Sequence, residues 1–180
     1  MPEARRPVPE PSVAMSAPVV TIEITKDYLH FSAAHFTIFG PGRRENLHGH
    51  NFDVGCYVDT RVGADGLCFD YNVVKSKLER LCNELDERMI VPERSPHISL
   101  ERDAEYLIVR FGDERIPFLT RDVLVLPIRN ATIEEFAAYF VGRLAGDPEI
   151  ERLPIDAITI RIASGPGQWA SCKWERSCNS

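Results

Sequence analysis

The pattern of hydrophobic and polar positions predicts two strands at the start of the ordered chain. Residues 20–36 are rich in apolar and β-branched side chains, which favours one long strand or a strand that bends around Asp27. Residues 39–45 contain Gly-Pro-Gly and must form a loop. Residues 47–60 follow, and apolar and polar side chains alternate there from Asn51 onward, which predicts a second strand.

Two later segments have helical spacing. The first begins at Asp70 and carries apolar residues on one face as far as Met89, and we expect Pro92 to end it. The second begins at Thr132, which forms a T-x-x-E capping box with Glu135 and precedes an apolar face. The sequence therefore predicts two amphipathic helices.

The segment between these helices has a different character. Residues 106–111 and 114–118 flank a Gly-Asp pair, which is typical of a two-residue hairpin turn. Pro117 places the second run at the edge of its sheet, because proline has no N–H to donate to a neighbouring strand. We therefore expect an inserted β-hairpin over about residues 97–120.

The chain closes with two more strands. Residues 155–162 alternate between apolar and polar, and a Gly-Pro-Gly turn leads to a second run over residues 169–174. The order of these elements predicts an α+β fold, in which two helices cover one face of an antiparallel sheet. Four main strands leave exposed edges, so we expect the chain to form a homo-oligomer.

Composition limits the class of protein. The chain has 180 residues, room for one domain, and its 44% hydrophobic and 27% charged residues are typical of globular proteins. Residues 1–18 hold five prolines and almost no large apolar side chain. This predicts a disordered tail in front of a single domain at residues 19–177. No apolar run reaches the roughly 20 residues of a membrane span.

Charge and cysteine usage bear on partners and compartment. A formal charge of −6 and a pI near 5.4 argue against nucleic acid or an anionic membrane as a partner. The five cysteines are an odd number without a CxxC pair, and the first residues lack the apolar segment of a signal peptide. We therefore expect a cytoplasmic protein with free thiols.

Histidines supply the candidate chemistry. His48 and His50 are two positions apart, so in a strand they lie on one face about 7 Å apart. An antiparallel return would bring His35 beside them, and three imidazoles suit a zinc ion with one open coordination position. Ordinary histidines with hydrogen-bond partners explain the same spacing, which by itself leaves both interpretations open. His30 and His97 are not expected to be ligands.

Several short segments resemble a known family. Residues 31–35 (FSAAH) and 47–52 (LHGHNF) resemble the two signature segments of the 6-pyruvoyltetrahydropterin synthase family, which includes the bacterial 6-carboxytetrahydropterin synthases. Residues 69–71 (FDY), 85–86 (LD) and 131–134 (ATIE) extend the similarity. The resemblance covers most of the chain after the proline-rich segment.

The resemblance implies a fold, an assembly and a reaction. It implies the tunnelling fold, a four-stranded antiparallel sheet with two helices on one side, assembled into trimers or hexamers with active sites between subunits. It also implies Zn²⁺ at His35, His48 and His50, and 7,8-dihydroneopterin triphosphate as substrate. Zinc in this family binds side-chain oxygens of the substrate, so that a base can move protons and triphosphate can leave.

The loop before His48 departs from the synthase pattern. Synthase members of the family carry a cysteine four residues before the first histidine of the HGH motif, and Arg44 stands there. Glu45 instead matches a subgroup with the pattern E-x-x-H-G-H, which is associated with side-chain cleavage to 6-hydroxymethyl-7,8-dihydropterin. A carboxylate there can act as general base, although a solvated loop residue would look the same in the sequence.

A second departure follows the first predicted helix. The family pattern there is Leu-Asp-His, whose acid and histidine relay protons, and this chain keeps Asp86 but has Glu87 in place of the histidine. A carboxylate pair could still move protons, because one charge raises the pKa of the other. Both residues could equally be surface charges of the helix.

A third departure concerns the substrate. Family members carry a glutamate that binds the guanidine-like edge of the pterin, and Ser164 stands at its place. Thr132 and Glu134 match the family's T-x-E segment and could contact a pterin, although Thr132 is also a helix cap. Arg43 and Arg44 suit a triphosphate, or are solvated loop residues.

These observations support two hypotheses. The first is a zinc-dependent lyase that acts on 7,8-dihydroneopterin triphosphate or a related pterin, with Glu45 and Asp86 moving protons. It covers triphosphate elimination and side-chain cleavage, and the missing cysteine favours cleavage. The second is a non-catalytic zinc-binding oligomer, or a family member with a substrate other than a pterin.

Overall fold

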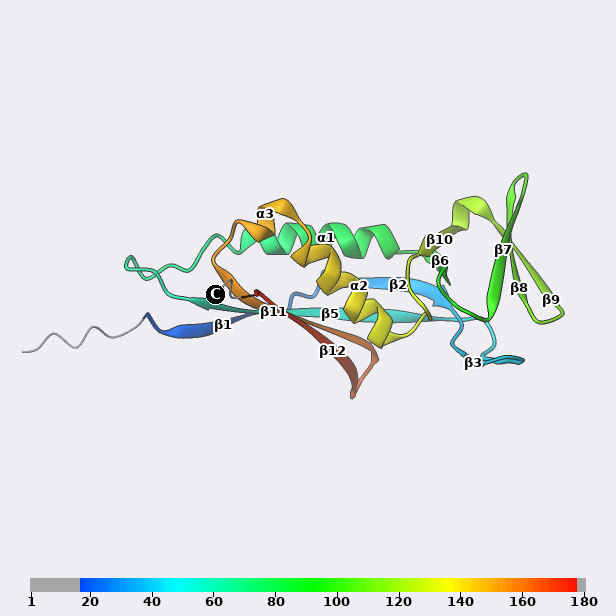
Figure 1. Ribbon diagram of the computed structural model, residues 1–180, viewed down its shortest axis with the longest axis horizontal. Helices are drawn as coiled ribbons and strands as arrows, with labels where there is room; N and C mark the ends of the chain where they lie inside the picture. Colours follow the sequence, from blue (N-terminus) through cyan, green and yellow to red (C-terminus); the bar gives the residue numbers. More distant parts are fainter. Residues whose placement is uncertain (1–16, 178–180) are drawn as a thin grey trace, which may run out of the picture.

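The computed structural model describes residues 17–177, so most of the predicted tail at residues 1–18 lies outside the described residues. In chain order the elements are β1 (Val19–Ile24), β2 (His30–His35), β3 (Ile38–Gly40), β4 (Arg43–Arg44), β5 (His48–Arg61), α1 (Asn72–Leu85), β6 (Arg88–Pro92), β7 (Ile98–Asp103), β8 (Tyr106–Phe111), β9 (Glu114–Leu119), a 3₁₀ turn (Thr120–Asp122), β10 (Val123–Leu126), α2 (Ile133–Ala145), α3 (Pro148–Glu151), β11 (Ile155–Gly165) and β12 (Gln168–Glu175) (Figure 1).

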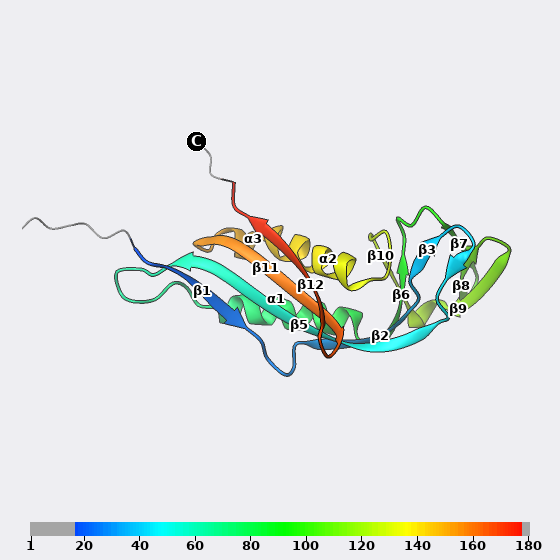
Figure 2. The same ribbon diagram turned by 90° about the horizontal axis from the view of Figure 1, so that it is seen from below.

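The long strand β5 organises the main sheet. Its first half pairs antiparallel with β2 and its second half with β1, so residues 19–35 form a strand that bends, as one of the two sequence interpretations held. On its other side β5 pairs antiparallel with β11, and β11 pairs with β12 (Figure 2). This ladder corresponds to the predicted four-stranded antiparallel sheet. Beyond β2, two short strands that were not predicted, β6 and β10, extend the sheet in parallel.

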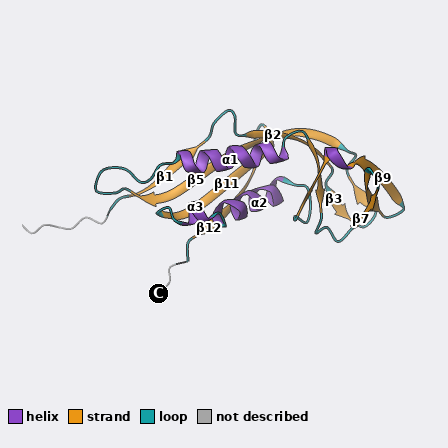
Figure 3. Ribbon diagram, turned by 90° about the horizontal axis from the view of Figure 1, so that it is seen from above, coloured by secondary structure: helices purple, strands orange, loops and turns teal. Residues whose placement is uncertain are grey.

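The helices lie together on one face of this sheet, as predicted (Figure 3). Their apolar faces pack on the sheet through an aromatic cluster in which Phe31 of β2 stacks on Phe52 of β5, with ring centroids 4.9 Å apart. Phe136 and Phe140 of α2 pack edge-on and stacked against Phe31, each at 5.8 Å. All four side chains are fully buried. They belong to the larger of the two hydrophobic clusters, called here the main cluster, and their packing anchors β2 and β5 near the ends that carry the histidines.

The first helix is shorter than the spacing predicted. It ends at Leu85 rather than near Pro92, because Asp86 is extended and Glu87 has a φ of 56°. Met89 therefore lies on β6, not on the helix, and β6 is buried between β2 and β10. An apolar run this short is compatible with a buried strand as well as with a helix. Here it forms a strand because it pairs with β2 and β10.

The second helix begins as predicted, but only half of the capping box forms. The Thr132 hydroxyl accepts a hydrogen bond from the Glu135 N–H at 3.5 Å. The Glu135 carboxylate does not return to Thr132; it accepts hydrogen bonds from the Arg129 N–H and guanidinium. The end of the preceding loop is therefore tied to the first turn of α2.

The inserted segment is a three-stranded sheet rather than a hairpin. The predicted hairpin is confirmed as β8 and β9, with Pro117 on the edge strand. The additional strand β7 was missed because most of its side chains are polar and exposed. A second cluster of buried side chains joins this sheet to the main one, and consists of Phe36, Ile38, Met89, Val91, Leu107, Val109 and Phe111.

No helix within residues 17–177 is long and apolar enough to cross a membrane. The prediction of a single domain at residues 19–177 stays a prediction.

Candidate active site at the histidine triad

Strand register brings three histidines together. In the antiparallel pair of β2 and β5, His35 lies directly opposite His48, and His50 follows two positions along on the same face. Each of these side chains offers a nitrogen within 4.8 Å of the other two. The ring centroids of His35 lie 4.6 Å from His48 and 5.4 Å from His50. The predicted cluster is therefore formed within one chain.

The triad stands on the main cluster. The ring of Phe52 packs edge-on against His35 at 5.5 Å and against His50 at 5.8 Å. His35 is buried, whereas His48 and His50 are half-buried. The packing fixes the ligand face of the strands before any ligand arrives, as a preformed metal site requires.

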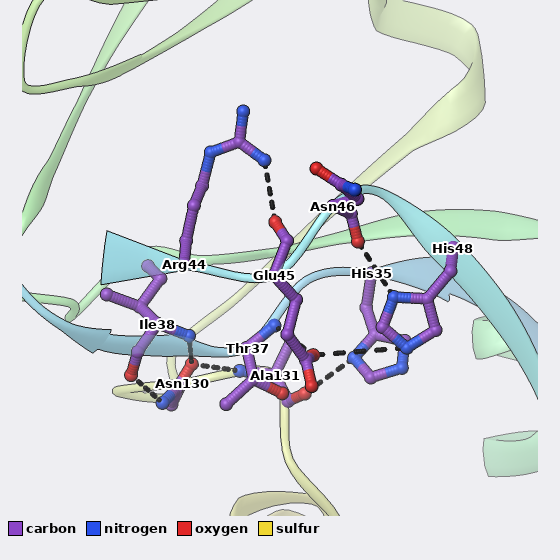
Figure 4. A network of polar contacts seen from close by, with 9 residues as sticks. All are labelled: His35, Thr37, Ile38, Arg44, Glu45, Asn46, His48, Asn130 and Ala131. Carbon is purple, nitrogen blue, oxygen red and sulfur yellow. Dashed lines mark hydrogen bonds and ion pairs between the residues drawn. The ribbon is translucent and has the colours of Figure 1, made fainter. Parts of the chain in front are cut away.

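Backbone carbonyls orient two of the rings. His35 Nδ1 donates to the Ala131 carbonyl and His48 Nδ1 donates to the Asn46 carbonyl, both at 2.8 Å (Figure 4). This leaves Nε2 of each ring as the lone-pair donor, the arrangement usual in zinc sites. His35 Nε2 is buried and has no hydrogen-bond partner among the described residues. A buried acceptor without a partner is costly, so it fits a metal ligand better than an ordinary core histidine.

The charge state of His35 suits the same role. Burial lowers the pKa of His35, and the neighbouring His48 and His50 lower it further, against the opposing effect of the Ala131 carbonyl. The ring is therefore neutral at neutral pH, the form that binds a metal ion. The residues present fit zinc.

Glu45 lies beside the triad. Its carboxylate accepts a hydrogen bond from the Thr37 N–H at 2.9 Å, and its own N–H donates to the Thr37 carbonyl at 2.9 Å (Figure 4). One carboxylate oxygen is 3.9 Å from His48 Nε2. Burial favours a higher pKa for Glu45, but the Thr37 hydrogen bonds and the nearby His48 and His35 outweigh it, so the pKa is lowered. The carboxylate is ionised.

A hollow of about 430 Å³ opens over the triad and Glu45. Thr132 and Glu134, the pterin contacts that the sequence analysis named, line it at the start of α2, and their contact with a pterin stays a prediction. Ser164 lies there too, and so do Gln168 and Phe39, which sequence reasoning missed. No motif marked either residue. Gln168 is far from the histidines in the sequence, at the start of β12, whereas Phe39 is close to them but stands on the short strand β3, in a segment that sequence reasoning treated as a plain loop.

The two loop arginines are placed differently. The Arg44 guanidinium binds the Glu114 carboxylate of β9 at 2.5 and 2.7 Å, lies over the Phe36 ring, and donates to the Glu45 carbonyl at 2.7 Å. It does not line the hollow. Arg43 does not line the hollow either, but it is exposed and lies over the ring of Phe39, 4.7 Å from its centroid, and Phe39 does line the hollow.

Asp86 is not brought to the triad of its own chain. Its carboxylate accepts a hydrogen bond from the Ser32 N–H at 2.7 Å, beyond the end of α1. The neighbouring Glu87 lines a second hollow of about 620 Å³ together with Ser32 and Asn51, and His50 lines both hollows. Within one chain, Glu45 is therefore the predicted proton-transfer residue that lies beside the histidines.

Comparison with known proteins decides the family. The sequence pattern of the 6-pyruvoyl tetrahydropterin synthase family matches residues 23–175. The chain belongs to this family. A protein of Methanocaldococcus jannaschii with the provisional name 6-carboxy-5,6,7,8-tetrahydropterin synthase is 31% identical over 147 residues, which cover 79% of this chain and 88% of that protein.

Solved structures of the 6-pyruvoyl tetrahydropterin synthase family share the fold. The Plasmodium falciparum enzyme has a TM-score of 0.82 and 28% identity, over 89% of this chain and 100% of that chain. The Plasmodium vivax enzyme has a TM-score of 0.82 and 24% identity, over 88% of this chain and 99% of that chain. Two further structures of the Plasmodium vivax enzyme carry alanine or cysteine in place of a glutamate described as a catalytic residue.

Family membership confirms the predicted family and the α+β tunnelling fold. Members of the 6-pyruvoyl tetrahydropterin synthase family are lyases, which supports an enzyme with a pterin-synthase-like function. The family is generally zinc-dependent, forms oligomers and uses pterin substrates. The histidine triad is the place in this chain where such chemistry is available.

Proposed function

We propose that this protein is a zinc-dependent lyase that acts on 7,8-dihydroneopterin triphosphate or a related pterin. His35, His48 and His50 would hold the metal ion, and zinc, when bound, supplies Lewis acidity toward oxygens of the substrate side chain. The observation that carries the proposal is the Glu45 carboxylate, 3.9 Å from His48 Nε2 in the hollow that contains the triad. An ionised carboxylate there is a general base within reach of a bound substrate.

The surroundings of Glu45 support a carboxylate base instead of a thiolate. Arg44 occupies the position of the family's cysteine, and its side chain is engaged with Glu114 outside the hollow. The Thr37 N–H holds one Glu45 oxygen, which leaves the other free to accept a proton. The glutamate described as catalytic in the Plasmodium vivax enzyme is in keeping with this assignment.

A carboxylate base favours cleavage of the substrate side chain. Glu45 takes the proton of the hydroxyl on the second side-chain carbon, and the bond between the first and second carbons breaks. The electron pair moves to the first carbon, the one attached to the pterin. That carbon takes the proton back from the Glu45 carboxyl group, which regenerates the base. The products are 6-hydroxymethyl-7,8-dihydropterin and a two-carbon aldehyde that carries the triphosphate, whereas elimination would release inorganic triphosphate.

Other residues of the hollow would bind the substrate. Ser164 is neutral, so Glu134 is the carboxylate besides Glu45 that lines the hollow and can bind the guanidine-like edge of a pterin. Arg43, which lies over the ring of Phe39, would contact the triphosphate. Asp86 would serve a neighbouring subunit in a trimer or hexamer, since it does not line the hollow of its own chain.

Ser164 and Glu87 also favour a second candidate, a zinc-binding oligomer without catalysis, because both replace functional residues of the family pattern. Glu45→Gln separates the two. It removes the base but keeps the side-chain shape, so an enzyme should bind zinc normally and lose about 100-fold or more in turnover. Glu105→Gln, in an exposed turn away from the hollow, is the matched control.

The experiment uses zinc-loaded full-length protein with 7,8-dihydroneopterin triphosphate, and identifies the products by mass spectrometry against a chelated sample. We expect 6-hydroxymethyl-7,8-dihydropterin, formed only with zinc and lost in Glu45→Gln. Release of inorganic triphosphate, together with a pterin whose side chain is shortened or oxidised, would instead show that the reaction is elimination. Unchanged substrate at full zinc loading would overturn the pterin lyase and leave the non-catalytic oligomer or a substrate other than a pterin.

A further inference from the structure

We propose that Asn130 is a positioning residue that holds His35 and Glu45 in one arrangement. The inference rests on the proposed function and deepens it, because these two residues are the metal ligand and the base. Asn130 is half-buried in the loop between β10 and α2, more than 80 residues from either of them in the sequence. No sequence motif assigns it a role.

The side-chain amide of Asn130 makes three hydrogen bonds to backbone groups. Its Oδ1 accepts from the N–H of Ile38 at 3.0 Å and from the N–H of Ala131 at 3.1 Å, and its Nδ2 donates to the Ile38 carbonyl at 2.8 Å (Figure 4). The opposite orientation of the amide would set an NH₂ group against two N–H donors. The three partners therefore admit one orientation.

One of these bonds leads to His35. Ala131, whose N–H is held by Asn130, provides the carbonyl that accepts from His35 Nδ1 at 2.8 Å. The position of that carbonyl fixes the plane of the His35 ring and leaves Nε2 as its free lone pair. Asn130 therefore acts on the buried ligand through a single residue, Ala131.

The other two bonds lead to Glu45. Asn130 pairs with both backbone groups of Ile38, and Glu45 pairs with both backbone groups of Thr37 through its carboxylate and its N–H, each at 2.9 Å. Consecutive residues of an extended chain direct their backbone groups to opposite sides. Residues 37–38 therefore lie between Glu45 and Asn130, and a displacement on one side moves the other.

A single amide thus connects the two functional groups. If the hydrogen bonds of this amide are lost, the Ala131 carbonyl and residues 37–38 are free to shift independently. His35 and Glu45 are then no longer held at a fixed position relative to each other. A change in the supporting shell of a metal site typically costs about 10-fold to 100-fold in metal affinity or activity.

The test replaces Asn130 in the full-length protein and reads the triad with Co²⁺, whose visible absorption reports ligand number and geometry. For Asn130→Ala we expect Co²⁺ affinity to fall about 10-fold or more, an altered absorption band, and kcat to fall by a similar factor with little change in KM. Asn83→Ala is the control, because Asn83 is exposed on α1 and its side chain makes no hydrogen bond with the described residues.

Asn130→Asp tests the connection to His35 and the connection to Glu45 separately. It also covers the case in which Asn130→Ala does not fold. Aspartate keeps the acceptor for the N–H groups of Ile38 and Ala131 but sets a carboxylate oxygen against the Ile38 carbonyl. We expect it to retain Co²⁺ affinity and to lose turnover. Conversely, a folded Asn130→Asp protein with wild-type kcat would overturn the connection to Glu45.

The outcomes separate this inference from the proposed function. A folded Asn130→Ala protein with the Co²⁺ affinity and spectrum of Asn83→Ala overturns the role of Asn130, even if its turnover has changed. If the unaltered protein turns over no pterin, the proposed function fails, and the Co²⁺ comparison still decides whether Asn130 positions His35.

Discussion

The two hydrophobic clusters of the molecule support different parts of the site. The main cluster packs the helices on β2, β5 and β11, and its rings of Phe31, Phe52, Phe136 and Phe140 are fully buried. The second cluster lies between β6 and the three-stranded sheet of β7, β8 and β9. The histidines stand on the main cluster, whereas the loop that carries Glu45 is tied to the inserted sheet by an ion pair.

This difference separates binding from catalysis. Metal ligands on packed strands keep their geometry at little entropic cost when the ion binds, because the strands are already ordered. The base depends on a few backbone hydrogen bonds and on Arg44, whose partner Glu114 is half exposed. We therefore expect changes in the main cluster to affect fold and metal together, and changes in the inserted sheet to affect turnover selectively.

Removal of a metal ligand should have the largest effect. We expect His48→Ala to abolish stoichiometric zinc binding and with it all measurable turnover, while the fold persists because His48 is only half-buried. Metal analysis of the purified protein and circular dichroism check both parts. His30→Ala is the control, because that exposed ring lies outside the triad. A His48→Ala protein with a full complement of zinc would show that the triad is not the metal site.

Cavities in the main cluster and in the second cluster should raise hydrogen exchange in different strands. Phe140→Ala leaves a cavity in the main cluster and should lower the free energy of unfolding by about 3–5 kcal/mol. Hydrogen exchange should then rise across β2, β5 and β11. For Phe111→Ala we expect the rise to concentrate in β7, β8 and β9, with β5 still protected. Equal loss of protection in both sheets would mean that the clusters unfold as one cooperative unit.

Loss of the ion pair should have the smallest effect. Glu114→Gln weakens the hold on Arg44 but keeps its contacts with Phe36 and the Glu45 carbonyl. A partly exposed pair contributes about 1 kcal/mol or less, so kcat should fall by well under 10-fold with zinc content unchanged.

Steady-state kinetics and metal analysis check this prediction for the ion pair. Asp103→Asn is the matched control, since it removes another exposed ion pair of the same sheet, to Arg115. If Glu114→Gln lost zinc, or if the control lowered kcat equally, the inserted sheet would have no selective action on the base.

Sequence analysis succeeded where the signal is local. Two histidines at spacing two need only an extended backbone to share a face, and the Thr132 cap and the β8–β9 turn depend on a few consecutive residues. It failed at the end of α1, where a short apolar run fits helix and strand alike until its pairing partners are known.

What the sequence by itself determined is therefore the family, the order of most elements and the three candidate ligands. Only the tertiary structure decided that Arg44 binds Glu114 instead of lining the hollow, that Asp86 lies away from the triad of its own chain, and that Asn130 joins His35 to Glu45. The physical reason is distance along the chain. These contacts join residues that lie 54 to 92 positions apart, so no local pattern encodes them, and they form only when the strands and loops have packed.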